Sequence, residues 1–272
     1  MTSFNTAYYY VLAVRINLIK VFKKIYFTTN FYKKSLVSRV PSQFLFFPNP
    51  FLMSYFSNYK NFAFQTKNLD SNQFWDKNYS LKEKKELHNF LWLSSIDRKD
   101  NASTLREIIS LWNQKNLQYK SIVWETSVIS KRIMSWILNS DIILKNSNFE
   151  FKRNFIESIV IQINHLKKNF RYEIDHQKKI EVITALTLSG LVFKEYEENY
   201  EYSLKELEKL IKTFFDDKGF PITRNPHDLL SHTKYFLLVK EVIKDAQKYV
   251  PDFLENILNS LKMRNISKIM YY

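Results

Sequence analysis

The scarcity of glycine is the feature that most limits how this chain can fold. Its 272 residues include 2 glycines, Gly190 and Gly219, and 6 prolines. Glycine supplies the left-handed backbone conformations of tight turns, and a β-sandwich or barrel needs a turn about every 8–12 residues. Two isolated glycines also exclude the glycine-rich loops with which nucleotide-binding folds hold phosphate. The composition therefore favours an all-α fold.

Apolar residues after residue 80 recur at the three- and four-residue spacing of amphipathic helices. Helix starts recur about every 25 residues, so that one helical pair occupies about 50 residues. The pairs share no repeated side-chain signature. This pattern is typical of antiparallel helical hairpins, and we expect an incomplete α/α toroid or an irregular α-solenoid. After two helices that start near Ser80 and Asp100, we expect helices over 125–140, 149–170, 177–193, 203–215, 228–248 and 251–263.

The first 80 residues have a different pattern. Tyr8–Phe27 is compatible with one helix, whereas residues 41–50 are expected to be extended because proline disfavours helix in the residue before it. Residues 59–79 indicate short strands or an irregular arm, packed on the helical body. We therefore divide the chain into an N-terminal helix and arm (1–80), a toroid domain (81–263) and a tail (264–272).

Positive charge is concentrated at the N-terminus. The formal net charge is +14, and the first 69 residues hold nine lysines and arginines but no acid before Asp70. A basic, aromatic-rich segment attracts polyanions such as nucleic acid, anionic lipid or acidic polysaccharide. The alternative source of this charge is a biased base composition, which would enrich Lys, Asn, Ile, Phe and Tyr together.

Several classes of site are disfavoured. Without cysteine, the chain cannot form disulfides, thiolate metal sites or a cysteine nucleophile. Its five histidines include no HExxH motif and no pair four residues apart, so neither a metal nor another cofactor is expected. The apolar runs are too short for a transmembrane segment. The N-terminus lacks the order of a secretory signal, which leaves the cytoplasm as the default location.

One broad helix face would hold Trp124, Arg132 and Trp136 if residues 124–140 are helical. Arg132 is 8 residues after Trp124 and 4 residues before Trp136, and both spacings return to nearly the same side of a helix. Such a face can be a cation–π stack inside a helical core. It can equally be a platform for a sugar ring beside an arginine that binds a carboxylate. The spacing alone leaves both interpretations open.

Several short motifs follow one another along the chain in a fixed order. They are Leu87-His88, Phe90 and Trp92-Leu93; Trp124-Glu125, Arg132 and Trp136; His165-Leu166 and Glu173; Ala185 and Gly190-Leu191; and Asp217, Gly219, Arg224 and Pro226. In the order of these motifs the chain resembles the N-terminal helical domain of the heparinase II/III-like polysaccharide lyases, in particular an alphaproteobacterial subgroup. The resemblance covers nearly the whole chain.

This resemblance implies an α/α toroid that acts by β-elimination on an acidic, uronate-containing glycan. It also implies a C-terminal β-sandwich, which has no counterpart after residue 263, so we expect a truncated chain. Export to the periplasm would also fit the family. On the family pattern His176 and Tyr235 are the candidate catalytic residues.

The substrate-binding candidates are Trp124, Arg132, Trp136, Arg224 and Asn225. Arg224 and Asn225 can bind a carboxylate or can instead cap and brace the helix that follows. The sequence departs from the family pattern where Asp175 replaces an asparagine and Asp228 replaces a tyrosine. An alternative hypothesis is a non-catalytic, basic α-solenoid that binds nucleic acid or a protein partner through its N-terminal arm.

Overall fold

A computed structural model describes residues 11, 14, 15, 18, 21–56, 75, 78–96, 102–216 and 218–269, with side chains described as far as residue 261. Most of these residues are helical, and the pairing of Phe215 with Pro221 is an isolated bridge rather than part of a sheet. The prediction of an all-α fold is therefore confirmed for the described part of the chain. None of the described helices is long and apolar enough to cross a membrane.

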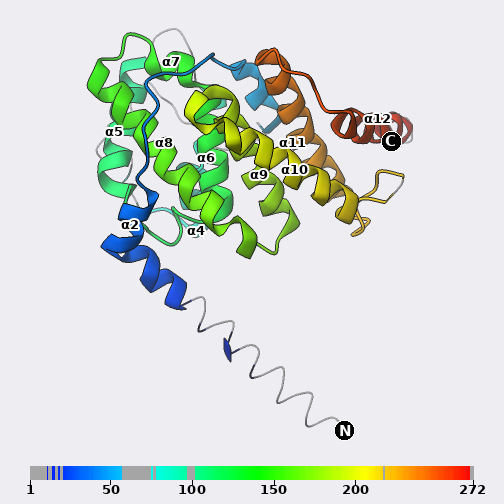
Figure 1. The fold of residues 1–272 in the computed structure, drawn as a ribbon, viewed down its shortest axis with the longest axis horizontal. Helices are drawn as coiled ribbons and strands as arrows, with labels where there is room; N and C mark the ends of the chain where they lie inside the picture. The colour runs from blue at the N-terminus through cyan, green and yellow to red at the C-terminus, as the bar shows by residue number, and fades with distance from the viewer. Residues whose placement is uncertain are drawn as a thin grey trace.

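Figure 1 shows the described helices packed into one body, with residues 21–36 at its lower left. The α-helices are α2 (Asn30–Leu36), α4 (Leu81–His88), α5 (Ala102–Asn116), α6 (Thr126–Leu138), α7 (Ser140–Leu144), α8 (Phe149–Asn169), α9 (His176–Val192), α10 (Glu197–Phe214), α11 (Pro226–Asp245) and α12 (Asp252–Ile269). The short 3₁₀ helices are η1 (Pro50–Phe56), η3 (Leu91–Ser95), η4 (Phe170–Tyr172) and η5 (Lys194–Tyr196).

Most predicted helices lie within a few residues of their observed bounds. There are two exceptions: α10 begins at Glu197 rather than at Ser203, and α12 continues to Ile269, into the predicted tail, rather than ending at Met263. Residues 41–49 have no regular structure, as expected, and residues 21–28 are helical. The rest of the predicted N-terminal helix falls only in part on described residues, and most of the predicted arm at 59–79 lies outside them.

Local capping explains several helix starts. Ser80 and Glu83 form a reciprocal capping box at the start of α4, where each side chain accepts from the other residue's backbone N–H. Asp175 accepts from the backbone N–H groups of Gln177 and Lys178 at the start of α9. These side chains satisfy N–H groups that have no partner within the helix.

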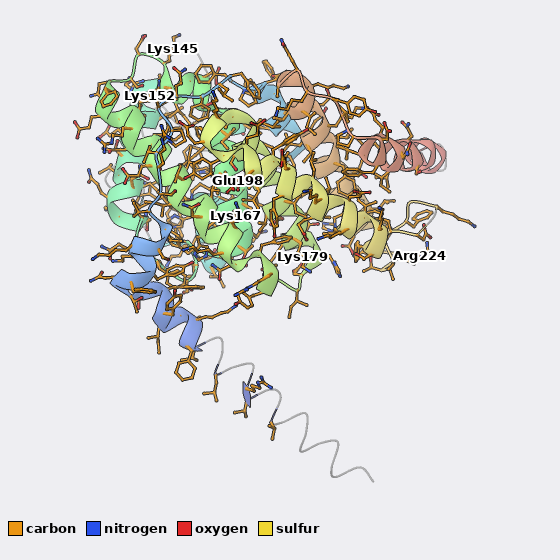
Figure 2. All side chains as sticks on the ribbon, viewed as in Figure 1. Lys145, Lys152, Lys167, Lys179, Glu198 and Arg224 are labelled. Atoms are coloured by element: carbon orange, nitrogen blue, oxygen red, sulfur yellow. The ribbon has the colours of Figure 1, made fainter. Side chains whose placement is uncertain are left out.

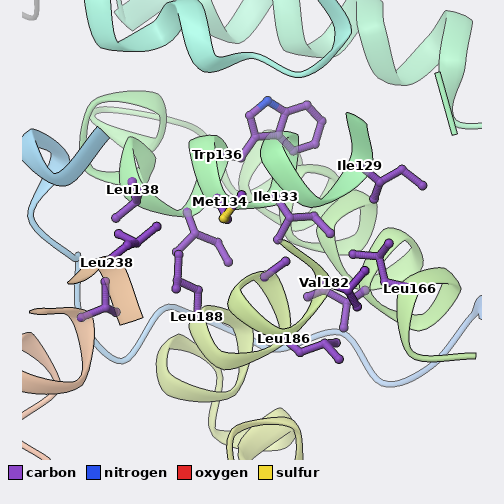
Figure 3. Close-up of a cluster of buried hydrophobic side chains, with 14 of the residues drawn as sticks. Ile129, Ile133, Met134, Trp136, Leu138, Leu166, Val182, Leu186, Leu188 and Leu238 are labelled. Atoms are coloured by element: carbon purple, nitrogen blue, oxygen red, sulfur yellow. The ribbon is translucent and has the colours of Figure 1, made fainter. Parts of the chain in front are cut away.

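The central helix is α9, which packs between α6 and α11. Helices α8 and α10 lie against α9 from other sides. Ion pairs from Glu125 to Lys178 and from Lys131 to Glu181 show that α6 and α9 run in the same direction. In Figure 3, Leu138, Leu188 and Leu238 gather at one end of the shared apolar cluster and Ile129 and Val182 at the other.

The N-terminal segment is attached to the helical body by specific contacts. α2 packs on α8, and the extended residues after it cross the body in the view of Figure 1. The backbone N–H of Leu45 donates to the carbonyl of Val192 at 2.9 Å, and that of Asn49 donates to the Asp245 carboxylate at 2.9 Å. Asn164 donates from its side chain to the Leu36 carbonyl at 2.8 Å.

Gly190 allows α9 and α10 to approach closely. A Cβ atom at this position would lie 2.3 Å from the backbone nitrogen of Tyr200, far inside van der Waals contact. Because the clash is with backbone, it cannot be relieved by a change of rotamer. Glycine is therefore required here by packing, although it is a poor helix former.

Gly190→Ala should lower the free energy of unfolding by about 1–3 kcal/mol, the usual cost of overpacking a core. Helix propensity alone would change it in the opposite direction, by about 1 kcal/mol. Urea unfolding followed by circular dichroism measures the difference, with Lys205→Ala on the exposed face of α10 as the control. A stability equal to or above wild type would contradict the close approach.

Candidate functional site

Arg132 lies in the core, where its guanidinium has no exposed surface. Its Nε donates to Gln162 at 2.6 Å, and Nη1 donates to the carbonyls of His88 at 2.8 Å and Val123 at 3.2 Å. The guanidinium carbon stands 4.2 Å from the ring centre of Trp112. This is the cation–π stack that the sequence left open, but its aromatic partner is Trp112 and not either of the two tryptophans expected.

Trp124 and Trp136 do not share one face. α6 begins at Thr126, so Trp124 precedes the helix and its indole N–H donates to the Asn116 carbonyl at 2.9 Å. Trp136 is fully buried, with its ring 5.2 Å from that of Trp112. The sugar-platform interpretation is therefore wrong for Arg132 and Trp136, because neither side chain offers surface to a ligand.

Tyr235 is also buried, at 2% exposure, and its hydroxyl donates to Glu181 Oε1 at 3.1 Å. The same carboxylate oxygen receives Lys131 Nζ and Gln177 Nε2, each at 3.1 Å. The other oxygen, Oε2, is buried and has no partner among the described residues. Tyr235 thus joins α11 to α9 and α6, and its hydroxyl is not placed at the surface.

Arg224 and Asn225 form the entry to α11. Arg224 has a left-handed backbone (φ 54°) and pairs through Nη1 with Asp216 at 2.6 Å. Asn225 is the N-cap, accepting from the His227 N–H at 3.0 Å, and its amide donates to Asp228 at 3.1 Å. The structure therefore favours the capping and bracing role over carboxylate binding. Figure 2 shows Arg224 on this loop and Lys179 on another part of the body.

His176 is an exposed predicted site residue and lines a surface cavity. It is the first residue of α9, and its ring stacks on Phe214 with 4.2 Å between centroids. The cavity has a volume of about 380 Å³ and lies between η4, the start of α9, and α10. Its lining comprises Phe170, Arg171, His176, Lys179, Tyr202, Glu206, Lys209, Leu210 and Thr213.

This His176 cavity is basic. Arg171, Lys179 and Lys209 line it, against the single carboxylate of Glu206, which pairs with Lys209 at 2.6 Å. Lys179 has no ion pair among the described residues, so its charge is available to a ligand. Tyr202 and Phe170 add aromatic surface, with 6.0 Å between their ring centroids. Cations beside aromatic rings are suited to an anionic ligand that also presents an apolar ring face.

Two buried histidines, His165 and His232, and the partly buried His88 have lowered pKa values. Burial, followed by the charge of Arg132, lowers the pKa of both His88 and His165 to about 3. Burial also lowers the pKa of His232 to about 4. His88 Nδ1 accepts from Trp112, and His165 Nδ1 shares a 2.7 Å hydrogen bond with the Tyr32 hydroxyl. Neither ring nitrogen of His232 has a partner among the described residues.

The sequence interpretation missed Glu181, although a signal was available. Glu181 is the single charged residue in the otherwise apolar or hydroxyl-bearing run 180–193. A carboxylate within a buried helix face must be paired, which predicts a cation nearby. The cavity at His176 had no such signal, because it combines residues from 170 to 213 that only the fold brings together.

Comparison with models of protein families gives no match for this chain, and comparisons with curated proteins and with solved structures give none either. The argument for function therefore depends on the geometry described above. Among the described residues, no group of three or more metal-ligating side chains is close enough to hold an ion.

These three histidines should make the fold sensitive to acid. Below pH 6.5 His88, His165 and His232 are protonated in the unfolded chain but stay neutral in the folded state, because their folded-state pKa values are lowered. The free energy of unfolding therefore falls as the pH decreases toward 4. Each histidine contributes up to about 1.4 kcal/mol per pH unit in this window.

His232→Leu removes a buried imidazole, with no hydrogen bond to any residue that the structure describes, from among the rings of Phe214, Phe215 and Phe236. We expect this variant to lose less stability than wild type between pH 7 and pH 5, measured by urea unfolding at each pH. His227→Leu, at an exposed position, is the matched control. Equal slopes for His232→Leu and wild type would contradict this assignment.

Proposed function

We propose that the chain is a heparinase II/III-like toroid domain that binds an acidic, uronate-containing glycan in the His176 cavity and has little or no β-elimination activity. The observation that carries the proposal is the composition of this cavity. Three cations and two aromatic rings line it, with one carboxylate. Uronate residues combine a carboxylate with the apolar face of a sugar ring, which matches both features.

The helix arrangement supports the toroid part of the proposal. Antiparallel hairpins closed into an arc place every second helix on the inside, where these helices run in one direction. In this protein α6 and α9 run in one direction, and α10 packs against both α9 and α12. The resemblance in sequence motifs gives the same architecture independently.

β-Elimination from a uronate requires three functions: neutralisation of the carboxylate, removal of the C5 proton and protonation of the leaving oxygen. His176 is exposed and can act as the base. Asp175, which precedes it, uses its carboxylate to cap α9. An anion at this position opposes the negative charge that develops on the substrate. Tyr235, the candidate acid, is held by Glu181 inside the core. Binding without efficient turnover follows from these positions.

The test is a binding panel with heparin, alginate and a neutral glucan, measured by calorimetry at low salt. We expect the acidic glycans to bind and the neutral glucan not to bind. Lys179→Gln and Arg171→Gln should each weaken binding by about tenfold, which corresponds to about 1.4 kcal/mol. Lys145→Gln, at the far side of the body, is the charge-matched control (Figure 2). Equal indifference to all three glycans would remove the proposal.

The same samples are assayed for unsaturated uronide by absorbance near 232 nm, roughly where a conjugated enoate absorbs. We expect no detectable product, since loss of one acid–base group costs about 10²–10⁴-fold in rate. If product forms and His176→Ala abolishes it while glycan binding persists, the chain is a working lyase and the second half of the proposal is wrong.

One observation favours a second candidate function, partner binding through the N-terminal segment. Val11, Val14, Leu18, Phe22 and Ile25 are all exposed and are spaced three or four residues apart, as on one helix face. This segment has basic residues and no acid. A protein partner would cover the apolar face, whereas nucleic-acid binding would weaken log-linearly with salt. A salt titration of RNA binding, together with light scattering for self-association, separates these outcomes from glycan binding.

A further inference from the structure

We propose that a second cavity, between α2, α5 and the loop before α6, binds a small organic anion that carries a flat ring. This ring-anion site is separate from the His176 cavity and does not depend on the proposed function. It has a volume of about 390 Å³, within the range of about 300–1,000 Å³ typical of small-molecule sites.

The walls of the ring-anion site are aromatic. The rings of Phe27 and Tyr119 pack against one another at an angle of 60°, with 5.0 Å between centroids, and the Tyr119 ring is 6.3 Å from that of Trp124. The three rings come from the N-terminal segment and from the loop before α6. Phe27 and Tyr119 are partly exposed, while Trp124 is buried. A flat ring that lies against the exposed parts of Phe27 and Tyr119 gains aromatic contact with both.

The floor of this site is fixed in place. The Tyr32 hydroxyl shares a 2.7 Å hydrogen bond with His165 and accepts from the Asn169 amide at 2.9 Å. The indole N–H of Trp124 is used by the Asn116 carbonyl. With these polar groups already paired, the floor presents apolar ring surface to a ligand. A rigid site of this kind loses little entropy on binding.

The charge of the lining points to an anion. Lys33 and Lys34 line the cavity, and none of the described lining residues carries a carboxylate. Neither lysine has an ion pair among the described residues, although Lys33 is partly buried. The adjoining cavity near Arg106 differs, because Glu107, Glu150 and Glu157 line it. An uncompensated, partly buried ammonium group gains from a carboxylate or phosphate placed beside it.

The aromatic walls and the two lysines together define the chemical class of the ligand. It is an aromatic or heteroaromatic ring that bears a carboxylate or phosphate.

The experiment measures binding of 2-naphthoate, 2-naphthyl phosphate, the neutral 2-naphthalenemethanol and saturated cyclohexanecarboxylate to the full chain by calorimetry. We expect the two aromatic anions to bind at least about tenfold more tightly than either of the other probes. The relative affinities of naphthoate and naphthyl phosphate decide which anionic group is preferred.

Variants locate the binding. Lys33→Gln with Lys34→Gln should weaken naphthoate binding by about tenfold or more and leave the neutral probe unchanged. Lys179→Gln, in the His176 cavity, should leave naphthoate binding unchanged, and this control separates failure here from failure of the glycan proposal. Because the three lysines have no ion pair among the described residues, the substitutions keep the fold.

Two results would overturn the proposal. One is equal affinity for naphthoate and naphthalenemethanol, which would mean that charge contributes nothing. The other is a loss of naphthoate binding in Lys179→Gln as large as in the Lys33/Lys34 variant, which would mean that binding depends on the net charge of the protein and not on these two lysines.

Discussion

Two adjacent cations in the middle of α6 hold the two halves of this fold together. Lys131 pairs with the buried carboxylate of Glu181 on α9, which Tyr235 of α11 also contacts. Arg132 bonds in another direction, to Gln162 of α8, to the His88 carbonyl of α4 and to the ring of Trp112 of α5. Successive residues of a helix point about 100° apart. Lys131 and Arg132 can therefore contact different neighbouring helices although they are adjacent in the sequence.

This arrangement decides which polar residues are free for chemistry. Arg132 was predicted as a site residue from its spacing to two tryptophans, and Tyr235 from the family pattern, but here their hydrogen bonds are made inside the core. Removing one partner of such a buried pair leaves the other without compensation, and that cost ties these residues to the fold. The groups that remain available lie at the surface, around His176 and beside Lys33.

The helical architecture could be predicted because apolar periodicity survives in a chain with few glycines and prolines. The early start of α10 could not, since Asn199 and Tyr200 are polar residues that happen to be buried against α9. The Trp124–Arg132–Trp136 face failed because one residue, Glu125, occupies the N-cap and places Trp124 outside the helix. His176 was found through its motif, whereas the cations around it come from distant segments and carry no spacing signal.

The central claim, that the α6 cations serve the fold, is tested most directly by a double-mutant cycle on Lys131 and Glu181. Urea unfolding compares wild type, Lys131→Met, Glu181→Leu and the double variant. We predict that Lys131→Met lowers stability by about 2–4 kcal/mol, because it leaves the buried carboxylate without its cation. The double variant should be more stable than Lys131→Met. If the two single changes instead add to within about 0.5 kcal/mol, the residues are not coupled and the claim is contradicted.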